Sequence, residues 1–258
     1  MAGHPVANEQ EGASLEKVIY ALWRASGDGR ADFSRRLRGD LAEKLLDLGA
    51  RGLQVNVADD DVAPADTLRQ TNTRPQMEGL LSIWVDTAIE KFRRPFDLAI
   101  AAAVERAEGY LVTESQPIRN TRHPARAGER TWGFSQLAFL RRPPRLSHEA
   151  WLDVWHNSHT QIAIDTQSTF LYVQNVVVRP LTYAAPRIDA LVEECFPPEA
   201  MTDLAVFFDA VGDQDKLRRN VQAMMDSCAR FIDRNEASGQ HMIDVVPTSQ
   251  YVIRPPAA

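Results

Sequence analysis

Apolar and polar positions along the first part of the chain follow an alternating order of strand and helix patterns. Short runs rich in β-branched and aromatic residues predict strands, and leucines at helical spacing predict a helix closed by Gly49. The expected elements, in the order strand, helix, strand, strand, helix, strand, are 17–23, 33–48, 52–57, 79–85, 95–108 and 110–114. The polar stretch 59–75 contains prolines and is expected to be a loop.

The second part of the chain repeats this order after a basic linker at 117–130. The pattern predicts strands at 132–140, 170–178 and 204–208 and near Tyr251. It also predicts one helix that starts at Ser147 and a second helix at 213–233. Residues 188–195 are expected to add a helix between the two central strands. The plan βαββαβ therefore occurs twice.

Three short matches, in the same order in both parts, support an internal repeat. They pair 53–57 with 172–176, 83–86 with 206–209, and 91–94 with 216–219. Repeats decide the architecture of a chain, so they are weighed before any topology is accepted.

A four-stranded βαββαβ sheet has one face covered by helices and one apolar face that must also be buried. A second copy can bury it, and two such sheets facing each other form a closed barrel. We therefore expect an α+β fold of two tandem ferredoxin-like halves, at 15–118 and 130–256, packed sheet to sheet in one chain. The alternative is two separate domains on a flexible linker.

One stretch of the second part has a recognisable pattern. Residues 137–151 read Leu-Ala-Phe-Leu-Arg-Arg-Pro-Pro-Arg-Leu-Ser-His-Glu-Ala-Trp, and Trp155, His159 and the strand Tyr-Val-Gln-Asn at 172–175 follow. Over about 132–178 this pattern resembles the EthD family of the dimeric α/β-barrel superfamily. The resemblance implies a single-chain version of that barrel and a role in the catabolism of organic compounds or in polyketide pathways. Muconolactone isomerases, polyketide cyclases and antibiotic-type monooxygenases share the superfamily's barrel.

The predicted helix after Ser147 carries one inward-facing stripe at helical spacing: Trp151, Val154, Trp155, Ser158, His159 and Ile162. An imidazole among aromatic rings is kept neutral by desolvation and can accept a proton near pH 7, so His159 is a candidate general base. We expect it to face the interior shared by the two halves. The alternative is a core histidine that only satisfies a buried carbonyl. The EthD-like pattern has its histidine at this position, whereas the first half has Leu41 there.

The strands beside this helix offer further candidates for a ligand cavity. Tyr172 and Asn175 could assist an enolate-like oxygen, and Gln174 could contact substrate together with Trp151 and Trp155. Because a strand sends alternate side chains to opposite faces, only one parity can line the cavity. On the preceding strand the choice lies between the set Phe134, Gln136 and Ala138 and the set Ser135, Leu137 and Phe139. For each polar residue a cross-strand hydrogen bond is the alternative role.

Composition narrows the class of protein. The net charge is −6 and basic residues are spread along the chain, so nucleic acid is not an expected partner. We see neither a secretory signal nor the ~18-residue apolar run of a spanning helix. The two cysteines, Cys195 and Cys228, have no CxxC spacing and are expected to be buried thiols in a reducing cytoplasm.

Cofactor motifs are missing from the sequence. There is no nucleophile elbow, phosphate loop, GxGxxG or HExxH motif, so we expect no cofactor. His156 precedes His159 by three residues, but two ligands at this spacing are too few for a metal, and none is expected. Haem binding is an alternative because related barrels place a histidine on haem iron, although no haem-specific signal is present.

These observations lead to two functional hypotheses. The first is a cofactor-independent lyase, cyclase or isomerase that acts on a small, apolar, oxygenated organic molecule. The second is a non-catalytic protein that binds or scavenges such a molecule for a partner oxygenase. A homodimer is compatible with the sequence.

Overall fold

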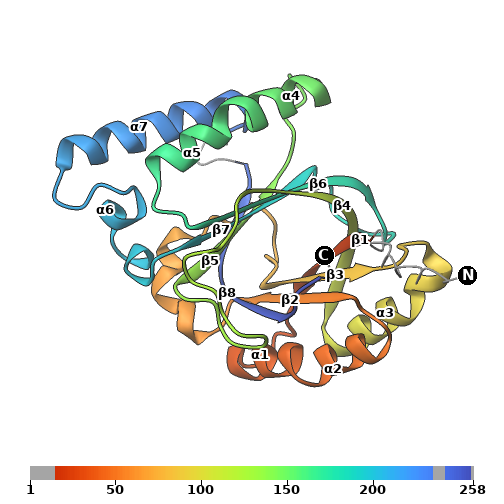
Figure 1. The fold of residues 1–258 in the computed structure, drawn as a ribbon. Helices are drawn as coiled ribbons and strands as arrows, with labels where there is room; N and C mark the ends of the chain where they lie inside the picture. The colour runs from red at the N-terminus through yellow and green to blue at the C-terminus, as the bar shows by residue number, and fades with distance from the viewer. Residues whose placement is uncertain (1–14, 235–241, 257–258) are drawn as a thin grey trace, which may run out of the picture.

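The computed structural model describes residues 15–234 and 242–256. Within these residues, antiparallel strands close into a barrel in the order β1-β3-β2-β8-β5-β7-β6-β4 (Figure 1). The strands are β1 Glu16–Trp23, β2 Gly52–Val57, β3 Gly79–Val85, β4 Arg106–Ile118, β5 Phe134–Leu140, β6 Leu171–Pro180, β7 Ala190–Phe196 and β8 Asp244–Arg254.

Each half of the chain supplies four consecutive strands of the barrel. The first half gives β4-β1-β3-β2 and the second gives β8-β5-β7-β6, which is the ferredoxin-like order in both. The halves are joined by hydrogen bonding at two seams, β2 with β8 and β4 with β6. Closure leaves no free strand edge. The predicted fold, two ferredoxin-like halves forming one barrel in a single chain, is confirmed.

Helices cover the barrel on two opposite sides (Figure 1). The first half contributes α1 Arg30–Arg38, α2 Asp40–Asp47, the 3-10 helix η1 Asp60–Leu68 and α3 Glu90–Ala103. The second half contributes α4 His148–Val154, the π-helical turn η2 Trp155–His159, α5 Thr160–Thr166, the 3-10 helix η3 Pro198–Met201, α6 Leu204–Phe207 and α7 Gln214–Phe231.

Three boundaries in the first half differ from the sequence expectation. The helix predicted at 33–48 is broken at Gly39, whose φ of −98° and ψ of −105° are not helical. Part of the predicted loop 59–75 is the 3-10 helix η1. Helix α3 covers 90–103 in place of the predicted 95–108. It ends earlier because β4 already begins at Arg106.

Two elements of the second half were predicted wrongly. Residues 188–195 do not form an extra helix: 190–196 are strand β7, buried along its whole length between β5 and β6. Residues 204–208 are not a strand, because β7 already fills that place in the sheet. Instead they hold the short helix α6, whose first turn is capped by Asp203. The match of 83–86 with 206–209 is therefore wrong, since the counterpart of β3 is β7.

The side chains form three layers. Inside the barrel, an apolar cluster includes Ile19, Leu80, Leu137, Phe139, Leu191 and Val246. Outside it, the helices of the first half pack Phe33, Leu37, Leu41 and Leu45 against the sheet. On the opposite outer side, the helices of the second half pack Trp151, Trp155, Met224 and Phe231 over their own strands.

A buried carboxylate joins the two halves inside the barrel. Glu193 of β7 accepts hydrogen bonds from Gln54 and Asn56 of β2, from Ser135 of β5 and from Gln250 of β8. Because its donors come from both halves, this carboxylate ties the β2–β8 seam to the centre of the second sheet.

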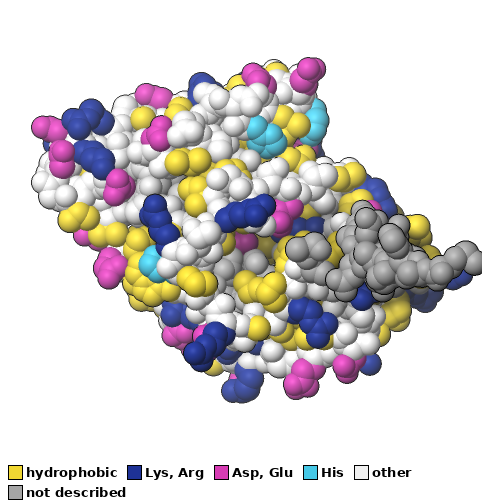
Figure 2. Space-filling view, in the orientation of Figure 1, with side chains coloured by type: hydrophobic (Ala, Val, Ile, Leu, Met, Phe, Trp, Pro, Cys, Tyr) yellow, Lys and Arg dark blue, Asp and Glu magenta, His cyan; other side chains and the backbone are white. Residues whose placement is uncertain are grey.

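The visible surface is mixed in charge. On the face shown in Figure 2, acidic and basic side chains are interspersed. In the described part of the chain, none of the helices is long and apolar enough to cross a membrane.

Candidate functional site

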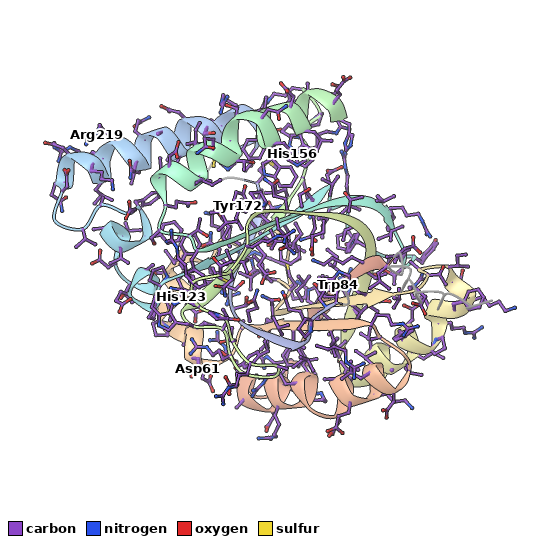
Figure 3. The ribbon with its side chains drawn as sticks, viewed as in Figure 1. Asp61, Trp84, His123, His156, Tyr172 and Arg219 are labelled. Atoms are coloured by element: carbon purple, nitrogen blue, oxygen red, sulfur yellow. The ribbon has the colours of Figure 1, made fainter. Side chains whose placement is uncertain are left out.

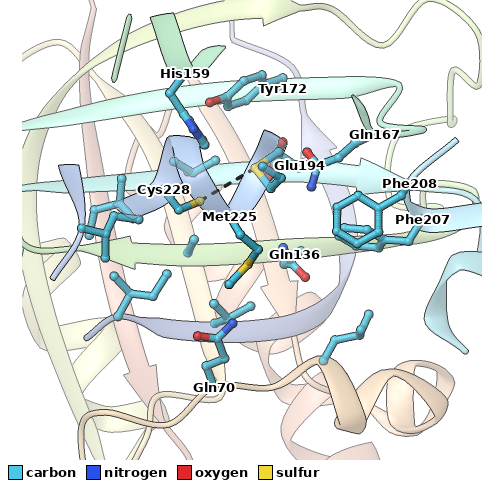
Figure 4. A pocket seen from close by; sticks show the side chains of 18 of the residues that line it. Gln70, Gln136, His159, Gln167, Tyr172, Glu194, Phe207, Phe208, Met225 and Cys228 are labelled. Atoms are coloured by element: carbon cyan, nitrogen blue, oxygen red, sulfur yellow. Dashed lines mark hydrogen bonds between the residues drawn. The ribbon is translucent and has the colours of Figure 1, made fainter. Parts of the chain in front are cut away.

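A cavity of about 450 Å³ lies between the outer face of the second half's sheet and its helices (Figure 4). Strands β5, β6, β7 and β8 supply Gln136, Ala138, Leu140, Tyr172, Val192, Glu194 and Val245. The helical side supplies Trp155, His159, Met224, Met225, Cys228 and Phe231. The end of α6 adds Phe207 and the residue after it, Phe208. Arg69 and Gln70, from the first half, complete the wall. Most of these side chains are apolar.

The cavity is not the interior shared by the two halves. On β5 the even-numbered residues 136, 138 and 140 line it, whereas Leu137 and Phe139 point into the barrel. The expectation that His159 faces the shared interior is therefore wrong. Helices of a ferredoxin-like half cover the outer face of its sheet, so a helical side chain reaches that layer only.

His159 is the last residue of the π-helical turn η2, between α4 and α5. Its side chain is 8% exposed, and Nδ1 lies 2.9 Å from Ser227 Oγ on α7. The ring centroid is 4.6 Å from that of Phe231. Arg230 donates to the same Ser227 hydroxyl at 2.9 Å. The imidazole is thus oriented by α7 at the wall of the cavity.

Tyr172 stands on the sheet side of the cavity, beneath the helices (Figures 3 and 4). Its hydroxyl oxygen accepts from Gln174 Nε2 at 3.1 Å, and the same amide donates to Thr160 Oγ1 at 2.8 Å. Burial, and secondarily the negative charge of Glu194, raises the pKa of the Tyr172 phenol well above its usual value. Tyr172 therefore stays a neutral hydroxyl whose hydrogen can be donated.

Glu194 is the group that the sequence analysis missed. It sits on β7 directly between Tyr172 on β6 and Gln136 on β5, its register partners on the two neighbouring strands. Burial raises the pKa of its carboxyl to about 7. Its Oε1 has no hydrogen-bond partner among the described residues. The signal in the sequence was a pair of glutamates within the otherwise apolar run 190–196, which was assigned to a helix.

Other polar atoms at the cavity also lack partners. The side-chain oxygens of Gln70 and Gln167 are buried and make no hydrogen bond. Burial raises the pKa of the Cys228 thiol to about 12, so this thiol stays protonated at neutral pH. The cavity therefore presents several acceptors and no thiolate.

Four of the predicted site residues meet at this cavity: His159, Tyr172, Trp155 and Gln136. Trp151 and Gln174 support it without being part of its lining. Trp151 donates to the carbonyl of Phe231 behind Trp155, and Gln174 holds the Tyr172 hydroxyl.

The remaining two predicted residues lie away from the cavity. Asn175 points to the opposite face of β6 from Tyr172 and donates to the carbonyl of Leu191 at 3.3 Å. Phe134 stacks on Phe196, which in turn stacks on Phe207. Asn175 therefore cannot act together with His159 on one ligand.

A metal site needs three or more His, Cys, Asp or Glu side chains close together. The described residues contain no such group. His156, labelled in Figure 3, is half-buried, and burial lowers its pKa.

Comparison with known proteins identifies a domain in the second half. Residues 143–235 match the family model of the EthD domain. This segment spans α4 to α7, including β6 and β7 with Tyr172 and Glu194. No curated protein matches the chain.

Solved structures resemble the whole chain. An anthrone oxidase-like protein aligns with a TM-score of 0.52 at 9% identity, over 95% of this chain and 93% of its own. A protein of Lactobacillus acidophilus NCFM, provisionally named a monooxygenase, aligns with a TM-score of 0.44 at 10% identity, over 95% and 98%. A mutant chlorite dismutase of Candidatus Nitrospira defluvii aligns with a TM-score of 0.43 at 8% identity, over 92% of this chain and 90% of its own. The first of these likenesses supports the barrel fold.

Proposed function

We propose that this chain, whose residues 143–235 match the EthD domain, is a cofactor-independent lyase, cyclase or isomerase. Its substrate is an apolar, oxygenated organic molecule held in the cavity between the second sheet and its helices. One observation carries this proposal: a mostly apolar cavity of about 450 Å³ that contains an imidazole and a carboxyl with a pKa near 7. The volume suits a small organic ligand.

The chemistry is a proton transfer. His159, at the cavity wall, removes a proton from carbon beside a carbonyl, and the electron pair of the C–H bond moves onto the carbonyl oxygen. The Tyr172 hydroxyl donates a hydrogen bond to the resulting enolate oxygen. Return of the proton to another carbon completes an isomerisation. Attack of the enolate carbon on a second carbonyl closes a ring, and loss of a leaving group gives a lyase reaction.

The walls of the cavity favour this reaction over one in water. Trp155, Phe207 and Met224 exclude solvent, which strengthens each hydrogen bond made to the developing charge. Gln174, by donating to the Tyr172 oxygen, directs the phenol hydrogen away from itself. We also propose that the protein acts in the cytoplasm.

A second candidate function is binding without turnover. The contact between His159 and Ser227 favours it, because a histidine held by the protein can serve as a structural member of the wall. The unpartnered side-chain oxygens of Gln70 and Gln167 can accept hydrogen bonds from a bound ligand whether or not the ligand is converted.

The experiment compares binding with conversion. Apolar ketones, lactones and phenols are screened by thermal shift, and every compound that raises the melting temperature is incubated with the protein and analysed for products. We expect His159→Ala to bind a converted compound and to lose at least about a hundredfold in kcat. His148→Ala, on the exposed start of α4, is the matched control and keeps full activity.

Two results would count against the proposal. A His159→Ala variant with unchanged kcat would remove this residue from the mechanism. Binding of many compounds with conversion of none by the unmodified protein would leave the binding function instead.

A further inference from the structure

Glu194 lies in the middle of a polar row on an otherwise apolar wall. Its register partners Tyr172 and Gln136 flank it on β6 and β5, and all three side chains point to the cavity (Figure 4). Its neighbours on the same face of β7 are the apolar residues Val192 and Phe196. A ligand that lies on this sheet therefore meets the carboxyl of Glu194 at the centre of the row.

Among the described residues, the Glu194 carboxyl takes part in none of the ion pairs. Arg69, the arginine at the cavity wall, is already engaged by Asp66 and Gln76. The other titratable groups facing the cavity are Tyr172 from β6, His159 from η2 and Cys228 from α7.

Unpartnered buried acceptors indicate what is absent from the site. A buried acceptor without a partner costs about 1–3 kcal/mol, so native proteins retain few of them. Oε1 of Glu194 is such an atom, and so are the side-chain oxygens of Gln70 and Gln167 at the same cavity. These three atoms are acceptors, whereas Nε1 of Trp155 at the same cavity is a buried donor without a partner among the described residues. The complementary molecule therefore donates hydrogen bonds and can also accept one, as a hydroxyl does.

We propose that Glu194 makes this cavity selective for neutral molecules bearing a hydrogen-bond donor, carbonyl compounds with a phenolic or enolic hydroxyl in particular, and selective against carboxylates. This inference rests on the proposed function, because it names the substrate class of the same cavity. A neutral hydroxyl on a flat apolar ring donates a hydrogen bond to the carboxylate, and the ring packs on Trp155 and Phe207.

The selectivity depends on pH in opposite directions for the two ligand classes. Burial raises the pKa of Glu194 to about 7, so the carboxylate form grows as the pH rises from 6 to 8. The carboxylate is the stronger acceptor for a hydroxyl, which makes phenol binding tighter at pH 8. A ligand carboxylate is repelled by it and is accepted only by the protonated acid, so its binding is tighter at pH 6.

The test uses three two-ring probes: 1-naphthol, 1-methylnaphthalene and 1-naphthoate. Their dissociation constants are measured by calorimetry at pH 6 and pH 8. We expect 1-naphthol to bind about fivefold to tenfold more tightly at pH 8 and 1-naphthoate to show the reverse trend, with 1-methylnaphthalene unchanged. In Glu194→Gln both trends disappear, because the amide does not titrate.

Two further variants assign the effect. His159→Asn removes the imidazole from the cavity wall, and the pH trends persist in it. Glu149→Gln, on the exposed face of α4, is the matched control for the loss of a carboxyl and behaves as the unmodified protein.

The outcomes separate this inference from the proposed function. Binding of 1-naphthol that is independent of pH, or the same in Glu194→Gln, overturns the role of Glu194 and leaves catalysis in the cavity standing. Trends that disappear in His159→Asn but persist in Glu194→Gln also overturn it. Failure of all three probes to bind to the unmodified protein counts against the cavity as a ligand site, and with it against both proposals.

Discussion

Glu193 and Glu194 are adjacent in the chain and differ in almost every physical respect. Glu193 points into the barrel, where its carboxylate accepts hydrogen bonds from Asn56, Ser135 and Gln250. Glu194 points outward into an apolar layer, where loss of water raises its pKa and its Oε1 has no hydrogen-bond partner among the described residues. Hydrogen bonds stabilise the ionised form of a buried carboxyl, whereas desolvation alone destabilises it. The alternation of a single strand thus places one carboxyl in a hydrogen-bond network between the halves and the other at the apolar cavity.

The raised pKa of Glu194 predicts a pH-dependent stability. The carboxyl holds its proton more tightly in the folded state, so its stabilising contribution is full below about pH 4.5 and is lost as the pH rises to about 7. Replacing it with an amide removes this loss. We expect the stability of Glu194→Gln relative to the unmodified protein to increase by on the order of 3 kcal/mol between pH 4.5 and pH 8.

Urea denaturation at several pH values measures this difference. Glu149→Gln, exposed on α4, is expected to show no such trend. A constant difference between Glu194→Gln and the unmodified protein across the range would contradict the assigned protonation.

At the scale of single elements, the backbone at the start of β5 is the tightest point of the second half. Gly133 has a φ of +80°, and a Cβ added there would lie 1.9 Å from the carbonyl oxygen of Phe196, at the end of β7. Gly128 also has a φ of +80°, but an added Cβ would meet nothing within 4 Å. The two glycines share the left-handed conformation and differ only in space.

This pair predicts two different costs. Gly128→Ala is expected to lose about 1–2 kcal/mol of unfolding free energy, the cost of the left-handed conformation for a residue with a Cβ. Gly133→Ala pays that cost and must also move the end of β7, so we expect a loss of several kcal/mol or no folded protein. Chemical denaturation of both variants is the measurement, and equal losses would contradict the steric argument.

Sequence patterns predicted most elements and failed at two. The helix start at Ser147 was correct, since its hydroxyl accepts from the Ala150 amide at 3.1 Å. Strand β7 is predicted wrongly as a helix, although its seven residues are all buried and two of them are glutamates. The burial of Glu193 depends on donors from distant strands and that of Glu194 on a cavity, neither of which a local pattern contains. The four residues of α6 are too few to show a helical period, so their apolar run also fits a strand.

At the scale of the whole molecule, the duplicated barrel was predictable and the location of the site was not. Two apolar sheet faces in one chain require a common interior, and hydrogen bonding at the β2–β8 and β4–β6 seams supplies it. The choice between the interior and the outer layers depends on how completely side chains fill each one. Leu41 and its neighbours pack the first half's outer layer, whereas the second half's outer layer contains the cavity.

The location of the ligand is the statement on which the functional account depends. It is tested by determining the structure of the protein with 1-naphthol bound. The account predicts that the ring lies between the outer face of β5, β6 and β7 and helix α7, with its hydroxyl at the carboxyl of Glu194. A ring bound inside the barrel, beside Leu137 and Phe139, would contradict the account.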